Sequence, residues 1–163
     1  MKAIVFHWTA GGAKASALDK QHYHYLVQQD GSTVAGDHAP EDNIDISDGN
    51  YAAHTLSANT GRIGVALCGM LGAAERPFNA GRAPITAPQV EALCGLLAGL
   101  CRRYEIAVTQ RSVLSHAEVQ PTLGIKQRGK WDVAWLPGMA APGDPVAVGD
   151  RIRAYVLKLM KGG

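Results

Sequence analysis

Two histidines and one aspartate are the residues of this sequence best suited to chemistry. His7 lies near the end of an apolar run, His116 follows a second apolar segment, and Asp132 comes after a glycine-containing stretch. Two imidazoles and a carboxylate can hold a zinc ion and leave its fourth coordination position open to water, as in catalytic rather than structural zinc sites. Lys130, two residues before Asp132, could then stabilise negative charge on an oxygen attacked by that water.

Each of these residues alone has an ordinary structural explanation. A histidine in a core strand is more often a hydrogen-bonded structural group than a metal ligand. A loop aspartate or lysine usually faces solvent. The chemistry is therefore predicted from the combination and from the sequence that surrounds it.

The elements that must position these residues can be outlined from apolar patterning. Runs of apolar and β-branched residues predict strands at 3–8, 23–27, 33–35 and 62–69, with a short extended segment at 113–116. Gln29-Asp30-Gly31-Ser32 predicts a hairpin turn. Polar, glycine-rich and proline-rich composition predicts loops at 36–61, 70–84 and 117–143.

Two helices are predicted in the second half of the chain. Residues 87–104 show helical apolar spacing, preceded by a capping box of Thr86 with Gln89 and a staple of Ile85 with Val90. A final helix begins near residue 144 or 150 and carries an apolar stripe. Strands mixed with helices predict the α/β class, with a mixed central β-sheet flanked by α-helices in a single domain over residues 1–163.

Composition excludes several classes of protein. The 16 Lys and Arg residues nearly balance the 14 Asp and Glu residues, which argues against a nucleic-acid binder that works by bulk charge. The three cysteines have no metal-type spacing, so we expect buried thiols and a reducing compartment. Neither a signal peptide nor a membrane span is recognisable, so we expect a protein that is made in the cytoplasm.

Five segments, in order along the chain, resemble the zinc N-acetylmuramoyl-L-alanine amidases, a superfamily that includes phage lysozyme-type amidases and peptidoglycan recognition proteins. These segments are His7–Gly11, Tyr23–Val27, Ala53–Val65, Ser115–Val119 and Gly129–Asp132. Together they cover about residues 3 to 139. Any one segment alone is weakly specific, whereas the five in family order are specific.

The resemblance implies roles for particular residues. It implies that His7, His116 and Asp132 bind Zn²⁺, that Lys130 stabilises the oxyanion, and that Tyr23 lies near the metal-bound water. The positions of His54 and Asn59 are those that line the groove or support its loop. Trp8 and Trp131 are candidate groove walls for a sugar ring, with simple packing as the alternative. Glu118 is interpreted as structural, with support of the metal site as the alternative.

The resemblance also implies the reaction, which is hydrolysis of the amide bond between N-acetylmuramic acid and L-alanine in peptidoglycan. We expect a phage-type endolysin without a separate cell-wall-binding domain, because the chain is short and its last helix is basic. Such a protein would be released to the periplasm or cell wall during lysis. Alternatives are an amidase that recycles wall fragments, a non-catalytic peptidoglycan-binding module, and a zinc hydrolase for another amide. The expected partner is peptidoglycan or a muropeptide, with no nucleic acid, no membrane span and a monomeric state.

Overall fold

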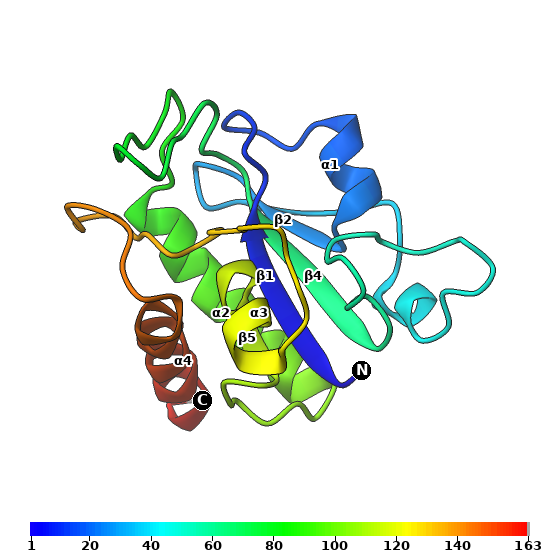
Figure 1. Cartoon of the computed structure of the whole chain (residues 1–163). Helices are drawn as coiled ribbons and strands as arrows, with labels where there is room; N and C mark the ends of the chain where they lie inside the picture. Colours follow the sequence, from blue (N-terminus) through cyan, green and yellow to red (C-terminus); the bar gives the residue numbers. More distant parts are fainter. Residues whose placement is uncertain (163) are drawn as a thin grey trace.

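The computed structural model describes residues 1–162 and is built around one five-stranded sheet (Figure 1). The strands are β1 (Ala3–Trp8), β2 (Tyr25–Val27), β3 (Thr33–Ala35), β4 (Arg62–Leu67) and β5 (Val113–Ser115). Their order in the sheet is β3-β2-β4-β1-β5. Only the β2–β3 hairpin is antiparallel, so the predicted mixed sheet of the α/β class is confirmed.

Helices cover both faces of this sheet. They are α1 (Ala17–His22), the short 3₁₀ helix η1 (Pro40–Asn43), α2 (Ala87–Arg103), α3 (His116–Leu123) and α4 (Pro145–Lys161). Figure 1 shows α2 behind the strands, α4 at the left where it packs against α2, and α3 in front of the strands. None of the helices in the described part of the chain is long and apolar enough to cross a membrane.

The central strand β1 is buried on both of its faces. Ile4, Phe6 and Trp8 pack into the large core that contains residues of α2 and α4. Val5, on the opposite face, packs into a smaller cluster with residues of β5 and α3. Because side chains alternate along a strand, His7 leaves β1 on the same face as Val5, toward α3.

Helix α2 is attached to the end of the sheet by its predicted capping box. Thr86 Oγ1 accepts from the Gln89 N–H at 3.3 Å, and Gln89 Oε1 accepts from the Thr86 N–H at 2.9 Å. The Gln89 amide then donates to the carbonyls of Val27 and Cys68 at 3.0 and 2.9 Å. These bonds hold the start of α2 against the carboxyl ends of β2 and β4.

Three sequence predictions of local structure were wrong. Residues 116–123 form α3 where a loop was predicted; the helix tolerates Pro121 because it is short and ends at Gly124, which has a left-handed φ of 75°. Residues 17–22 form α1, so β2 begins at Tyr25 rather than at residue 23. Strand β4 ends at Leu67 rather than at residue 69, because the Gly69 N–H donates to the Thr9 side chain at 3.2 Å and not to a backbone carbonyl of β1.

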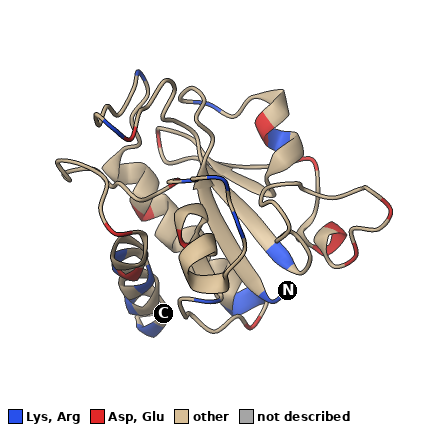
Figure 2. Cartoon of the chain, in the orientation of Figure 1, with Lys and Arg blue, Asp and Glu red and all other residues tan. Residues whose placement is uncertain are grey.

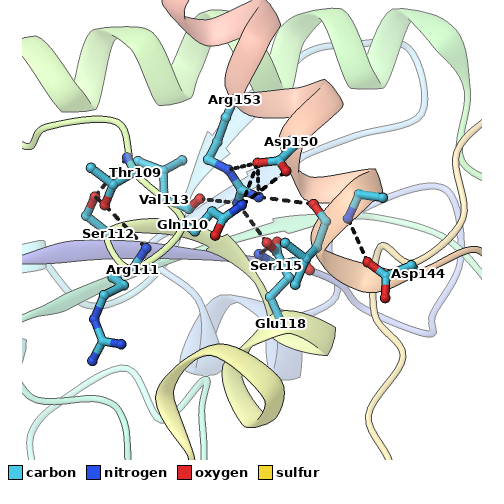
Figure 3. Close-up of polar contacts among 12 residues, drawn as sticks. Thr109, Gln110, Arg111, Ser112, Val113, Ser115, Glu118, Asp144, Asp150 and Arg153 are labelled. Atoms are coloured by element: carbon cyan, nitrogen blue, oxygen red, sulfur yellow. Dashed lines mark hydrogen bonds and ion pairs between the residues drawn. The ribbon is translucent and has the colours of Figure 1, made fainter.

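Most basic side chains of α4 face solvent, and one does not. Lys and Arg are spread along this helix (Figure 2), where Arg151, Lys158 and Lys161 are exposed. Arg153 is buried and reaches back to the sheet, where its Nη1 donates to the Val113 carbonyl at 2.9 Å (Figure 3). The three cysteines are free and buried, as predicted.

Candidate active site

The two predicted histidine ligands are brought together by the register of two parallel strands. Phe6 of β1 pairs with Ser115 of β5. Continuing that register by one residue places His7 opposite His116, which is the first residue of α3. The site therefore forms at the carboxyl ends of the strands, where open α/β sheets commonly place their sites.

Three donor atoms converge at this point. His7 Nδ1 lies 3.0 Å from His116 Nδ1, and Asp132 Oδ2 lies 3.2 Å from His116 Nδ1 and 3.8 Å from His7 Nδ1. Zinc bonds of about 2.0–2.1 Å at tetrahedral angles separate neighbouring donor atoms by roughly 3.3 Å. The spacing, the burial and the chemistry of this donor set fit a zinc ion with one coordination position left over.

Asp132 is held in place by a sharply turned segment. Its backbone carbonyl accepts from the Ala117 N–H in the first turn of α3 at 3.3 Å. The next residue, Val133, is fully buried and has a φ of +64°, which is unfavourable for a β-branched side chain. Strain of this kind persists only where the surroundings over-determine the backbone, and it gathers at functional sites.

Burial and local charge keep His7 and Asp132 in the forms that bind metals. Burial lowers the pKa of His7 to about 4, although the hydrogen bond with Asp132 opposes this shift. Burial acts to raise the pKa of Asp132, but hydrogen bonds and charge interactions with His116 and His7 outweigh it and hold the pKa well below its usual range. Neutral imidazole and ionised carboxylate are the forms that bind metals.

The outer nitrogens of both histidines also have partners, which sequence reasoning missed. His116 Nε2 lies 2.8 Å from Gln127 Oε1, and His7 Nε2 lies 3.4 Å from Thr55 Oγ1. Both partners lie in segments predicted only as loops. A single sequence gives no signal for them, because their role depends on how two distant loops meet.

A cleft of about 670 Å³ opens over the site. Tyr23, His116, Gln127 and Lys130 are among the residues that line it. The Tyr23 ring centroid lies 5.1 Å from that of His7, and burial together with the Asp132 charge raises the pKa of the Tyr23 hydroxyl. Tyr23 is therefore a neutral hydrogen-bonding group at neutral pH.

A second cleft, of about 770 Å³, shares Lys130 with the first. Its other lining residues come from the loop around Phe78, the loop before α4, and Trp131. Lys130 is exposed, and its charge contributes to the lowered pKa of His7. The amine thus lies where the two clefts adjoin, within electrostatic reach of the ligands.

The sequence matches the N-acetylmuramoyl-L-alanine amidase family over residues 1–138. The chain belongs to the N-acetylmuramoyl-L-alanine amidase family. No curated protein matches the sequence significantly.

Solved structures show the same amidase and recognition-protein fold. The endolysin amidase LysCS of Clostridium intestinale URNW is 17% identical, with a TM-score of 0.57 over 96% of this chain and 83% of the other. The amidase LysC of the same organism is 17% identical, with a TM-score of 0.56 over 96% and 85%. Drosophila peptidoglycan recognition protein SD is 20% identical, with a TM-score of 0.51 over 88% and 85%.

In this member of the amidase family, His54 and Asn59 lie in the wall of the first cleft, with most of their surface buried. His54 Nδ1 is 2.8 Å from Thr55 Oγ1, and its ring covers Gly64, where a Cβ would lie 2.4 Å from His54 Cγ. Asn59 Oδ1 accepts from the Thr55 N–H at 2.8 Å. Their observed bonds shape the loop that carries Thr55.

The two tryptophans predicted as groove walls differ in position. Trp131 is half-buried and lines the second cleft. Trp8 is 4% exposed, belongs to the main core and lines neither of the two clefts described over residues 1–162. Its ring packs edge-on against Trp131, with centroids 4.6 Å apart, so Trp8 supports the wall from behind.

Glu118 follows the structural interpretation. Its carboxylate is fully buried, accepts from the Ser115 N–H at 2.7 Å and lies 2.8 Å from Arg153 Nη1 (Figure 3). It contacts the residue that precedes His116. Its position therefore fixes the strand-to-helix junction that carries the ligand.

Proposed function

We propose that this chain is a zinc-dependent amidase that hydrolyses the bond between N-acetylmuramic acid and L-alanine in peptidoglycan. The observation that carries the proposal is the convergence of His7 Nδ1, His116 Nδ1 and Asp132 Oδ2 within 3.8 Å of one another, beside the cleft that His116 lines. Membership of the amidase family supports the choice of bond.

The three donor residues would hold the ion, which when bound lowers the pKa of water toward neutrality and so supplies a nucleophile. The neutral Tyr23 hydroxyl orients that water or the substrate carbonyl by a hydrogen bond. The Lys130 ammonium stabilises the oxyanion that develops on the amide oxygen. Burial of the three ligands limits solvent screening of the charge at the donor cluster.

The two clefts on either side of Lys130 give the substrate an extended path. An amide bond at Lys130 leaves its two substituents in different clefts. The half-buried indole of Trp131 offers an apolar face in the second cleft, of the kind that packs against a sugar ring. In this proposal residues 1–163 act as one catalytic unit, which works as a monomer on peptidoglycan or muropeptides.

We also propose an endolysin-type role. The likeness in fold to LysCS, whose name describes it as an endolysin amidase, supports this role over wall-fragment recycling. The complete set of three donors weighs against a non-catalytic binding module.

The test is digestion of purified peptidoglycan, followed by mass spectrometry of the released material. Samples contain the protein alone, the protein with a chelator, and the chelated protein with zinc restored. We expect peptides that begin at L-alanine, intact glycan chains, loss of products with chelator and recovery with zinc. Folded, zinc-loaded protein that releases nothing would identify a binding module, and cleavage of a different amide would identify another hydrolase. Comparing intact sacculi with soluble muropeptides separates lysis from recycling.

A further inference from the structure

The side-chain amide of Gln127 is fixed in one orientation by two carbonyl groups. Gln127 is 3% exposed and lies in the segment that follows α3. Its Nε2 donates to the Leu56 carbonyl at 2.9 Å and to the Ile125 carbonyl at 3.4 Å. Because a carbonyl oxygen only accepts hydrogen bonds, the amide nitrogen must face these two groups and Oε1 must face the other way.

The oxygen end of this amide faces a predicted metal ligand. Gln127 Oε1 lies 2.8 Å from His116 Nε2. An amide oxygen only accepts hydrogen bonds, so Gln127 favours the neutral His116 ring that carries its proton on Nε2. This is the form required when a metal ion, rather than a proton, lies between Nδ1 and the Asp132 carboxylate. The lone pair is then on Nδ1, the atom that lies 3.0 Å from His7 Nδ1 and 3.2 Å from Asp132 Oδ2.

We infer that Gln127 is a positioning residue that selects Nδ1 of His116 as the metal-binding atom. The inference rests on the proposed zinc site. Partners of this kind, on the far nitrogen of a ligating histidine, fix both the tautomer and the orientation of the ring.

The Gln127 amide also connects the predicted ligand His116 to the wall of the first cleft through hydrogen bonds. Leu56, whose carbonyl accepts from Gln127, lines that cleft, and its neighbour Thr55 contacts His7 Nε2. The backbone N–H of Gln127 donates to Gln120 Oε1 on α3 at 2.9 Å, which holds the segment to the helix that begins at His116. Gln127 therefore joins the cleft wall to both the ring and the helix of this ligand.

Two substitutions separate the hydrogen bond that Gln127 Oε1 accepts from His116 from the one that Gln127 Nε2 donates to Leu56. In Gln127→Leu both are lost, and we expect zinc affinity to fall about 10- to 100-fold, the usual effect of removing such a partner. In Gln127→Glu a carboxylate oxygen still accepts from Nε2, whereas the donor to Leu56 is lost. We expect this variant to retain most of the zinc affinity while amide exchange around Leu56 becomes faster.

Zinc affinity is measured by competition with a chromogenic chelator, and circular dichroism checks the fold of each variant. Gln110→Leu, at an exposed position before β5 where the amide contacts Asp150 and not the donor cluster, is the matched control and should bind zinc like the parent protein. Parental affinity in Gln127→Leu would overturn the inference. An equal loss of zinc affinity in Gln127→Leu and Gln127→Glu would also overturn it, because the hydrogen bond to Leu56, and not the one from His116, would then account for the loss.

A measurement on the unsubstituted, zinc-loaded protein tests the choice of nitrogen directly. Long-range ¹H–¹⁵N spectra at pH 8 distinguish a ring protonated at Nε2 from one protonated at Nδ1. We expect Nε2–H for His116, and Nδ1–H would refute the inference. This readout needs no turnover. Zinc-loaded protein with Nε2–H that fails to cleave peptidoglycan would therefore defeat the proposed function while the role of Gln127 stands.

Discussion

Arg153 of α4 and Glu118 of α3 form a buried ion pair, with Nη1 2.8 Å from Oε1 (Figure 3). The Glu118 carboxylate also accepts from the Ser115 N–H, and Arg153 donates to the Val113 carbonyl. These contacts join α4 to the last residues before His116. The family match ends at residue 138, so a helix outside the matched segment stabilises the junction that carries a predicted ligand.

Removing the positive charge of Arg153 should destabilise the fold strongly. In Arg153→Met the Glu118 carboxylate loses the cation at 2.8 Å in a site without solvent, and losing one partner of a buried pair typically costs about 3–5 kcal/mol. Urea unfolding measures the loss. The exposed neighbour Arg151→Met is the control and should change stability by no more than about 0.5 kcal/mol. A loss in Arg153→Met as small as that of the control would show that the pair does not stabilise α4.

Gly149 is required for the close approach of α4 to Glu118. A Cβ at this position would lie 2.1 Å from Glu118 Oε2. We expect Gly149→Ala to lower stability by about 1–3 kcal/mol, as overpacking does. Gly95→Ala in α2 is the matched control, because nothing lies within 4 Å of its Cβ, and helix propensity alone should add up to about 1 kcal/mol. Thermal unfolding that shifts both variants upward would contradict the packing argument.

Sequence reasoning succeeded where the signal was local and periodic. The strand 3–8 and the strand 33–35 were predicted at their observed bounds, and α2 differs by one residue at its end. The start of that helix was predicted correctly from the capping box of Thr86 and Gln89. The two residues of a capping box lie within a single helical turn, so the motif can be recognised in the sequence.

The remaining features depend on long-range packing. Helix α3 carries Pro121, and proline inside an apolar pattern argues for a loop in sequence, yet the buried Glu118 and the left-handed Gly124 stabilise a short helix there. The orientation of Gln127 depends on carbonyls 71 and 2 residues away in the sequence. The three predicted ligands were recognisable by resemblance, whereas the groups that orient them became visible only in the structure.

Stability should fall with pH below neutrality because His24 is buried in its neutral form. Burial lowers the pKa of His24 from 6.5 to about 4, and Nδ1 accepts from the Gly64 N–H at 2.8 Å. The unfolded chain therefore takes up this proton at higher pH than the native protein does. The free energy of unfolding is constant above about pH 7 and decreases as pH falls from about 6.5 to 4. His7 and His54 act in the same direction.

Urea unfolding of the metal-free protein between pH 7.5 and 4.5 measures this dependence. His24→Gln should reduce the slope below pH 6.5, whereas His22→Gln, at a partly exposed position, should keep the parental slope. A parental slope in His24→Gln would assign the whole dependence to other groups.

Removing a predicted ligand should abolish metal binding and turnover together. His116→Ala deletes one of three donor atoms, and two donors hold zinc far less firmly. Zinc content after dialysis, measured by elemental analysis beside peptidoglycan cleavage, should fall from about one ion per chain to a small fraction. One retained ion per chain would exclude His116 from the ligand set. His38→Ala, a histidine of the β3–η1 loop, should retain both zinc and activity.

Substitution of Lys130 should lower the rate of catalysis and leave metal binding unchanged. Its side chain is exposed and takes no part in the donor cluster, so Lys130→Ala should keep the fold and bind zinc normally. Loss of a group that stabilises an oxyanion typically lowers the rate about 10²–10³-fold, and we expect that loss in kcat because the charge develops only in the transition state. Lys126→Ala is the matched control, because it removes an exposed lysine that lines neither cleft in the described structure. Parental turnover in Lys130→Ala would leave the donor cluster and Tyr23 to stabilise the oxyanion, and a lysine at the boundary of two clefts would then serve substrate binding, which a raised KM with unchanged kcat would reveal.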